Sequence, residues 1–109
     1  AVAPVTSWRF YDTIYTERFM RTPQENPEGY DLNSPFNYPE LLKGDYLLIH
    51  GSGDDNVHLQ NTMRMAEALV QANKPFELMI YPDKNHGIFG GNTRLHLYDK
   101  MTNFILNKL

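Results

Sequence analysis

Two residues suited to acid–base chemistry follow two apolar segments of the sequence. Asp54 follows segment 46–50 after a Gly-Ser-Gly turn, and His86 follows segment 76–81 after a short polar loop. A carboxylate bound to one imidazole nitrogen fixes the tautomer of a histidine and stabilises its protonated form, so the other nitrogen can take a hydroxyl proton. Acid before histidine is also the order of the last two members of one type of serine–acid–histidine triad.

The spacing leaves other interpretations open. Sheets with alternating helices often carry an aspartate and a histidine on adjacent loops without catalysis, so His86 could be a solvated loop histidine. Asp55 competes with Asp54 for the acid role; otherwise Asp55 would be a helix N-cap or a first-turn charge favoured by the helix dipole. Gly87, directly after His86, would let the backbone turn sharply under the ring.

The other three histidines are expected to have structural roles. His50 ends a buried strand and is predicted to be a hydrogen-bonded core residue. His58 is predicted in the first turn of a helix, and His96 on the last helix, facing solvent. No two histidines have the spacing of metal ligands with a third ligand nearby, so neither a metal site nor a cofactor is expected.

The elements that must position Asp54 and His86 follow from the hydrophobic pattern. Strands are expected at residues 1–5, 46–50 and 76–81. Helices are expected at 8–21, 35–42 (with Ser34 as N-cap), 57–73 and from 93 onwards, with a surface loop at 22–33. Strands alternating with helices form parallel sheets with right-handed crossovers and bind ligands at the carboxyl ends of the strands. The predicted fold class is α/β, with three parallel strands alternating with helices.

Two of these helices have an apolar stripe that should face the sheet. The stripe of helix 57–73 consists of Leu59, Met63, Ala66, Leu69 and Val70. The inner face of the last helix, with Thr93 as its N-cap, consists of Leu97, Met101, Phe104 and Ile105.

An aromatic cluster occupies the first predicted helix and has two interpretations. Its members are Trp8, Phe10, Tyr11, Tyr15 and Phe19. They could pack a helix onto the sheet, which is the usual role of any single ring. They could instead form an apolar pocket for a flat ring such as proline, with tyrosine hydroxyls as hydrogen-bond donors.

The composition is that of one small globular domain, with 41% hydrophobic and 21% charged residues among 109. The formal net charge is −3 and the basic residues form no run, so nucleic acid is not expected as a partner. The chain has no cysteine, which excludes disulfides, thiolate metal sites and a cysteine nucleophile. No apolar stretch approaches the length of a membrane span.

No serine of the chain lies in a Gly-x-Ser-x-Gly elbow, the turn that presents the nucleophile of α/β-hydrolases. The sequence begins Ala1-Val2-Ala3-Pro4, without an initiator methionine. We therefore expect residues 1–109 to be the C-terminal half of an α/β-hydrolase fold within a longer protein, with the nucleophile upstream of Ala1.

Three groups of residues resemble a known family. They are Ala1-Val2-Ala3-Pro4-Val5 with Trp8, Tyr11-Asp12 and Tyr15-Thr16-Glu17-Arg18; Tyr46-Leu47-Leu48-Ile49-His50-Gly51 with Asp54-Asp55-Asn56-Val57-His58; and His86-Gly87-Ile88. Together they resemble the C-terminal end of serine peptidases of the prolyl oligopeptidase family, in its dipeptidyl peptidase branch, and only residues 22–38 resemble it weakly. The resemblance implies an α/β-hydrolase domain with an N-terminal β-propeller, which removes N-terminal dipeptides with Pro or Ala as the second residue.

The resemblance also implies roles for individual residues. Asp54, rather than Asp55, would be the triad acid, and His86 the base. Residues implied to hold the proline ring of the substrate are Val5, Trp8, Tyr11, Tyr15 and Val57. Asn56 is implied to contact the substrate backbone. The nucleophile serine, an oxyanion tyrosine and the glutamates that bind the substrate amino group would lie upstream. A homodimer contact through the last helix and the sheet edge beside it, and export to the periplasm or cell surface, are implied as well.

Alternatives of two kinds remain open. An acylaminoacyl peptidase or a prolyl endopeptidase shares the fold and the triad, although the Tyr-rich helix and the Asp-Asn-Val-His sequence disfavour both. A non-catalytic α/β interaction module would use the same fold for assembly. Without a nucleophile the chain alone should hydrolyse nothing measurable. Its strand 1–5 would present an open apolar edge through which copies of the chain self-associate.

Overall fold

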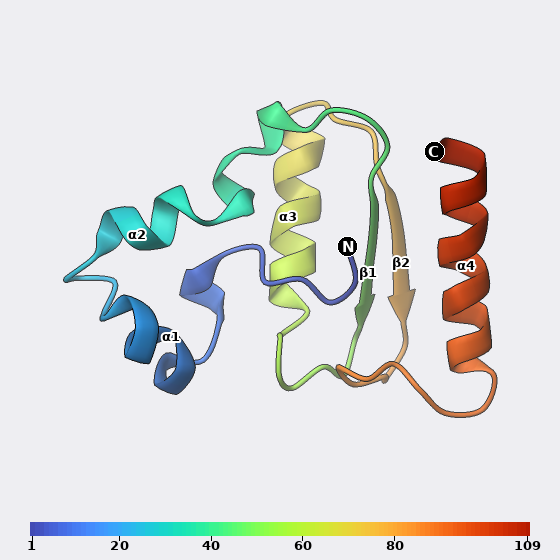
Figure 1. Cartoon of the computed structure of the whole chain (residues 1–109), viewed down its shortest axis with the longest axis horizontal. Helices are drawn as coiled ribbons and strands as arrows, with labels where there is room; N and C mark the ends of the chain where they lie inside the picture. The colour runs from blue at the N-terminus through green and yellow to red at the C-terminus, as the bar shows by residue number, and fades with distance from the viewer.

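A two-stranded parallel sheet with one helix on each face forms the centre of the computed structural model, which describes all 109 residues (Figure 1). The strands are β1 (Leu47–Gly51) and β2 (Glu77–Tyr81). Helix α3 (Gln60–Gln71) connects them and covers one face, and helix α4 (Thr93–Lys108) covers the other. The α/β class, the two strands and both covering helices are confirmed.

The core has two halves because alternate residues of a strand face opposite sides of the sheet. On one side, Leu48 of β1 packs with Met65, Ala66 and Leu69 of α3. On the other, a cluster of buried side chains connects the sheet to α4: Leu47, Ile49, Tyr81, Ile88 and Leu97. Both faces of β1 are therefore buried, as the continuous apolar run at 46–50 predicts.

Both strands end at the same edge of the sheet. Gly51 pairs with Tyr81 in the last position of the register, so the following loops start side by side. The backbone N–H of Ser52 donates to the carbonyl oxygen of Tyr81 at 3.0 Å, and that of Gly53 donates to Lys84 at 2.9 Å. A Cβ at position 51 would collide with the Lys84 carbonyl oxygen, so the close approach of the loops requires glycine there.

The predicted third strand is reduced to one pair of residues. Val2 forms an isolated parallel bridge with Ile49 of β1. The backbone N–H of Ala3 donates to the carbonyl oxygen of Ile49 at 2.8 Å, but Ala3 has a positive φ of 46°. Because this dihedral turns the chain and Pro4 has no N–H to donate, the pairing stops after Ala3.

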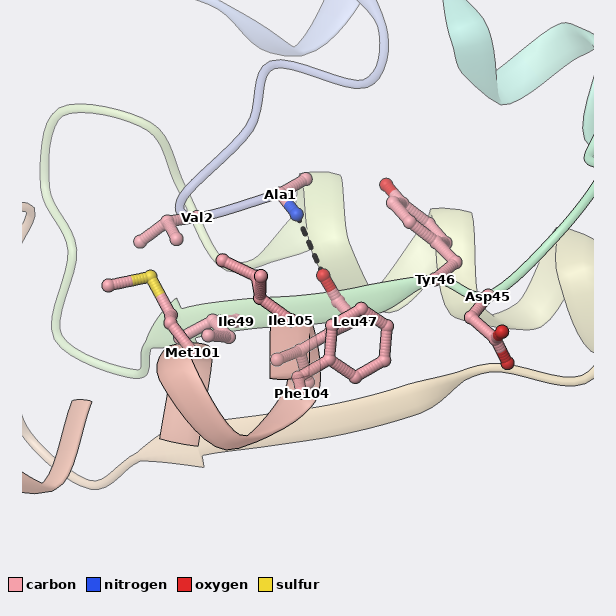
Figure 2. Close-up of a pocket in the computed structure, with 9 residues that line it drawn as sticks. All are labelled: Ala1, Val2, Asp45, Tyr46, Leu47, Ile49, Met101, Phe104 and Ile105. Atoms are coloured by element: carbon pink, nitrogen blue, oxygen red, sulfur yellow. Dashed lines mark hydrogen bonds between the residues drawn. The ribbon is translucent and has the colours of Figure 1, made fainter. Parts of the chain in front are cut away.

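An apolar groove of about 230 Å³ lies between this N-terminal segment, β1 and α4 (Figure 2). Val2, Met101 and Ile105 are among the side chains that line it. Ile105 lies on the predicted inner face of α4 but is 52% exposed, whereas Leu97 on the same face is buried. Ile105 remains exposed because no other segment of the chain covers the groove.

The predicted helix 8–21 is divided in two. A 3-10 turn, η1 (Trp8–Phe10), precedes helix α1 (Thr13–Met20). Asp12 separates them because its side chain accepts a hydrogen bond from the backbone N–H of Tyr15 at 2.7 Å and so begins a new helix.

The predicted loop and short helix that follow also differ from the structure. The loop contains helix α2 (Pro27–Leu32), which Asn26 caps by accepting from the N–H of Gly29 at 3.2 Å. Two 3-10 turns, η2 (Pro35–Asn37) and η3 (Pro39–Leu41), replace helix 35–42. A continuous helix would need an N–H at position 39, which proline lacks.

Helix α3 begins three residues later than predicted, and its buried face is shifted. Met63 and Val70 are 46% and 57% exposed, whereas Met65 is buried. Residues 54–57 form a turn before the helix, and this turn carries the candidate site.

Candidate active site

Asp54 and His86 are in contact at the carboxyl edge of the sheet. Nδ1 of His86 lies 2.8 Å from Oδ2 of Asp54, and the expected hydrogen bond is present. The carboxylate is completely buried, whereas 44% of the imidazole side chain is exposed. Because an ionised carboxylate only accepts hydrogen bonds, Nδ1 carries a proton, so the neutral form of the ring has its lone pair on Nε2. This tautomer can accept a proton at Nε2, which has no hydrogen-bond partner.

The turn around Asp54 fixes the carboxylate. Oδ1 accepts hydrogen bonds from the backbone N–H groups of Asn56 and Val57, both at 2.9 Å. Burial alone would raise the pKa of this carboxyl group, but the hydrogen bonds from His86, Asn56 and Val57 outweigh burial and hold the pKa below its ordinary value. Asp54 is therefore ionised at neutral pH and held in one orientation.

The loop of His86 is anchored in the core by Ile88, which is 1% exposed. The backbone N–H of Ile88 donates to the carbonyl oxygen of Asn85 at 3.1 Å, and that of Gly87 donates to the Asn85 side chain at 3.0 Å. Positive φ angles occur on both sides of His86, at Asp83 (59°) and Ile88 (44°), and again at Gly90 and Gly91. The sharp turns therefore lie on either side of His86 and Gly87 rather than at Gly87.

Three aromatic rings form a row beside the site. The ring centroids of Trp8 and Tyr11 are 6.2 Å apart and those of Tyr11 and Tyr15 are 5.5 Å apart, both edge to face. Tyr15 is 51% exposed and Phe19 67% exposed. Packing of this helix onto the sheet is therefore the wrong interpretation: α1 lies beyond α3, away from the strands (Figure 1).

A hydrogen bond connects this aromatic row to the turn of Asp54. The hydroxyl group of Tyr11 donates to Oδ1 of Asn56 at 2.9 Å, across 45 residues. Val57, the next residue, is 4% exposed and belongs to the buried core. Hydrogen bonds therefore connect Tyr11 to Asn56, and the backbone of Asn56 and Val57 to the carboxylate of Asp54.

Val5 is half-buried in the segment between the bridge of Val2 and η1. Thr6, the residue after it, fixes this segment to α3: its N–H donates to Oδ1 of Asn61 at 3.0 Å and its hydroxyl donates to the Asn61 carbonyl at 2.6 Å. Phe10 points elsewhere and packs edge to face on Phe36, with ring centroids 5.8 Å apart. Of the five aromatic residues, Phe10 therefore has a packing role.

The sequence model of the prolyl oligopeptidase family matches residues 1–109, the whole chain. The chain belongs to the prolyl oligopeptidase family.

Similar proteins place the chain within one part of that family. It is 49% identical over 109 residues to "Probable dipeptidyl-aminopeptidase B" of Neurospora crassa and 47% identical to the protein of the same name from Coccidioides posadasii, covering 98% of this chain and 12% of each relative. The crystal structure of Porphyromonas gingivalis dipeptidyl peptidase 4 superposes with a TM-score of 0.98 at 60% identity, covering 100% of this chain and 16% of that one. The chain thus spans a small part of the length of these dipeptidyl peptidases.

Two residues near Asp54, Asp55 and His58, are not where the sequence predicts. Because α3 of this family member begins at Gln60, neither Asp55 nor His58 is in a helix, and both first-turn interpretations are wrong. His96 is exposed, as predicted, but its Nδ1 also lies 2.8 Å from the hydroxyl oxygen of Tyr81. Its ring therefore connects α4 to the end of β2.

His50 is a buried and hydrogen-bonded core residue, as predicted, with 0% exposure. Its Nδ1 lies 2.6 Å from Oγ1 of Thr62, and its Nε2 lies 2.7 Å from the carbonyl oxygen of Val57. Nε2 is also 3.2 Å from Oδ2 of Asp54. His50 thus lies next to the same carboxylate oxygen of Asp54 that binds His86.

Asn61 and Thr62 are two residues of the site that sequence patterns do not single out. Both are fully buried, and they bind Thr6 and His50. For Asn61, the sequence signal is its position in the helix. It lies one helical turn before Met65, on the buried face of α3, where a polar side chain needs a hydrogen-bond partner.

No group of three His, Cys, Asp or Glu side chains in the structure could hold a metal ion. None of the helices combines the length and the apolar character needed to cross a membrane.

Proposed function

We propose that this chain contributes the acid and the base of the catalytic triad of a serine-type dipeptidyl peptidase. The enzyme would remove N-terminal dipeptides with proline or alanine as the second residue. The observation that carries the proposal is the 2.8 Å hydrogen bond between Nδ1 of His86 and Oδ2 of Asp54. Membership of the prolyl oligopeptidase family and the similarity to dipeptidyl peptidases support the substrate class.

In this mechanism, Nε2 of His86 accepts the proton of the serine hydroxyl while the serine oxygen attacks the scissile carbonyl. The same nitrogen then donates the proton to the leaving amine. Asp54 stays ionised, keeps the imidazole in the Nδ1–H tautomer and stabilises the imidazolium. The half-exposed ring of His86 and the buried carboxylate of Asp54 suit these two roles. The proposed reaction requires no cofactor.

The aromatic row would hold the proline ring of the substrate. Rings arranged edge to face give Trp8, Tyr11 and Tyr15 rigid apolar surfaces, with the hydroxyl groups of the two tyrosines at their margin. Val5 and Val57 would add apolar contacts, and the Asn56 amide would bind the substrate backbone.

The remaining catalytic groups are proposed to come from the rest of a longer protein. The sequence contains no Gly-x-Ser-x-Gly elbow, and the chain covers 12% of its curated relatives. The nucleophile, the oxyanion donor and a β-propeller that binds the substrate amino group would lie in that remainder. The isolated 109-residue chain is then expected to hydrolyse no Gly-Pro ester or amide.

The proposal extends to assembly and location. A homodimer of the longer protein would use α4, whose outer face exposes Leu95, Tyr98 and Leu106. Exposed apolar residues on one helix are a feature of many subunit contacts. Export to the periplasm or cell surface is proposed from the resemblance to this family alone.

The deciding experiment is a substrate comparison with the purified full-length protein. We expect rapid cleavage of Gly-Pro-p-nitroanilide, no cleavage of its N-acetylated form, and a loss of about 10⁴-fold or more in kcat for His86→Ala. Cleavage of acetylated or internal Gly-Pro would instead indicate a prolyl endopeptidase, and release of an acetylated amino acid would indicate an acylaminoacyl peptidase. Unchanged cleavage by His86→Ala would exclude the proposed base.

A further inference from the structure

The ring of His50 is surrounded by polar groups that belong to the turn of the candidate acid. It is the fourth residue of β1 and has 0% exposure. Nε2 faces the carbonyl oxygen of Val57 at 2.7 Å and Oδ2 of Asp54 at 3.2 Å. Nδ1 faces the hydroxyl oxygen of Thr62, in the first turn of α3, at 2.6 Å. The charged group that faces His50 is thus Asp54.

The partners determine which nitrogen carries the proton. A carbonyl oxygen and an ionised carboxylate can only accept, so Nε2 of His50 must be the donor. Nδ1 of the neutral ring is then an acceptor, and the Thr62 hydroxyl donates to it. The Val57 carbonyl and the Asp54 carboxylate therefore fix the tautomer of His50, just as Asp54 fixes that of His86, and the Thr62 hydroxyl holds the other ring nitrogen.

These contacts hold the turn 54–57 through both backbone groups of Val57. The backbone N–H of Val57 donates to Oδ1 of Asp54, and the carbonyl of the same residue accepts from His50. Oδ2 of Asp54 receives the N–H of His86 on one side and faces that of His50 on the other. A displacement of His50 would therefore move both the carboxylate and Asn56–Val57.

We propose that His50 is a positioning residue, which holds the carboxylate of Asp54 and the turn 54–57 from behind while Thr62 holds His50. This inference rests on the proposed function, because it assigns His50 to the support of the same acid and the same pocket. It predicts two kinetic effects of replacing His50. kcat should fall because the Asp54 carboxylate orients His86, and KM should rise because the turn 54–57 carries residues of the proposed pocket.

The test uses the full-length protein with Gly-Pro-p-nitroanilide and counts active sites with a fluorophosphonate probe. For His50→Leu we expect a fall of about 10-fold or more in kcat per active site, by analogy with the loss of groups that orient metal-binding side chains. KM should rise as well. The acidic limb of kcat/KM should move to higher pH, because Oδ2 without the N–H of His50 acts with its full charge on His86.

Two further variants separate this role from simple core packing. His50→Gln should restore most of the activity, since its amide can donate to Val57 from the position of Nε2. Thr62→Val should give the same changes as His50→Leu but smaller, and it keeps the proposal testable if His50→Leu does not fold. Thr102→Val, the same substitution at an exposed position of α4, is the matched control.

Failure of this inference differs from failure of the proposed function. If His86→Ala is inactive while His50→Leu and Thr62→Val keep wild-type kcat per active site, KM and pH profile, His50 is only a core residue and the inference is wrong. If the wild type hydrolyses no Gly-Pro substrate or His86→Ala stays active, the proposed function is wrong and the inference falls with it.

Discussion

The hydroxyl group of Tyr11 donates a 2.9 Å hydrogen bond to the side-chain oxygen of Asn56. Tyr11 follows η1 in the N-terminal segment, and Asn56 lies in the turn after β1, so the bond joins two parts of the chain 45 residues apart. One of these parts carries the aromatic row and the other the candidate acid. The bond thereby sets the distance between the proposed proline pocket and the proposed catalytic pair.

Tyr11→Phe should weaken substrate binding without removing the chemistry. The net value of one such hydrogen bond is about 0.5–1.5 kcal/mol, so we expect KM for Gly-Pro-p-nitroanilide to rise roughly two- to tenfold. The check is steady-state kinetics of the full-length protein. Tyr98→Phe makes the same change on α4, which lies on the other side of the sheet from α1 (Figure 1), and should leave KM unaltered; equal KM values for both variants would argue against the bond.

Asp54 should make stability depend on acid pH. Its folded-state pKa lies below the ordinary value of about 3.9, so ionised Asp54 stabilises the fold at pH values above this and the contribution is lost as pH falls through the folded-state pKa. The free energy of unfolding of Asp54→Asn should therefore be lower than that of the wild type at pH 7, and the difference should shrink below about pH 4. Urea unfolding at several pH values measures this; a constant difference would contradict it.

Gly51→Ala should separate the two loops at the sheet edge. A Cβ there meets the backbone carbonyl of Lys84, which cannot rotate away, so we expect a loss of about 1–3 kcal/mol and a lower kcat as His86 shifts. Gly44→Ala is the comparison, since φ is +79° there and space around it is open. It should lower the thermal midpoint through backbone strain while kcat stays at the wild-type level. Loss of kcat in both variants would mean that the effect at Gly51 is not local.

The open sheet edge at Val2, which borders the apolar groove, should make the isolated chain self-associate. Val2, on the outer side of β1, is 42% exposed and borders the groove of Figure 2. Val2→Lys should shift sedimentation of the 109-residue chain toward the monomer, because a charge disfavours edge pairing. Val70→Lys on exposed α3 should not. A monomeric wild-type chain at high concentration would contradict the prediction.

The sheet and the edge at which Asp54 and His86 meet could be predicted from sequence because they depend on local patterns. Apolar runs mark β1 and β2, and parallel pairing brings the residues after them to the same edge. The break at Asp12 also has a local cause, an N-cap within a helical pattern, but hydrophobic spacing alone conceals it.

Other features depend on contacts between distant segments. Tyr30 is 1% exposed in a stretch whose composition indicates a loop, because the N-terminal segment packs against it: the Arg9 guanidinium lies over its ring, and its hydroxyl donates to the carbonyl oxygen of Arg21. Thr62, the partner of His50 on α3, likewise can be identified only when that helix lies against β1. The burial of His50 follows from the strand pattern, but the direction of its two nitrogens does not.

The most direct measurement is kcat of Asp54→Asn beside Asp55→Asn in the full-length protein. The two positions are adjacent, and the substitutions are identical in size and charge. Asparagine at 54 can present an N–H to His86 and favour the wrong tautomer, so kcat for Gly-Pro-p-nitroanilide should fall by about 10⁴-fold. Asp55→Asn should keep kcat within a few-fold of the wild type, since Asp55 is exposed and does not touch His86. Wild-type kcat for Asp54→Asn, or an equal loss in both variants, would contradict the account.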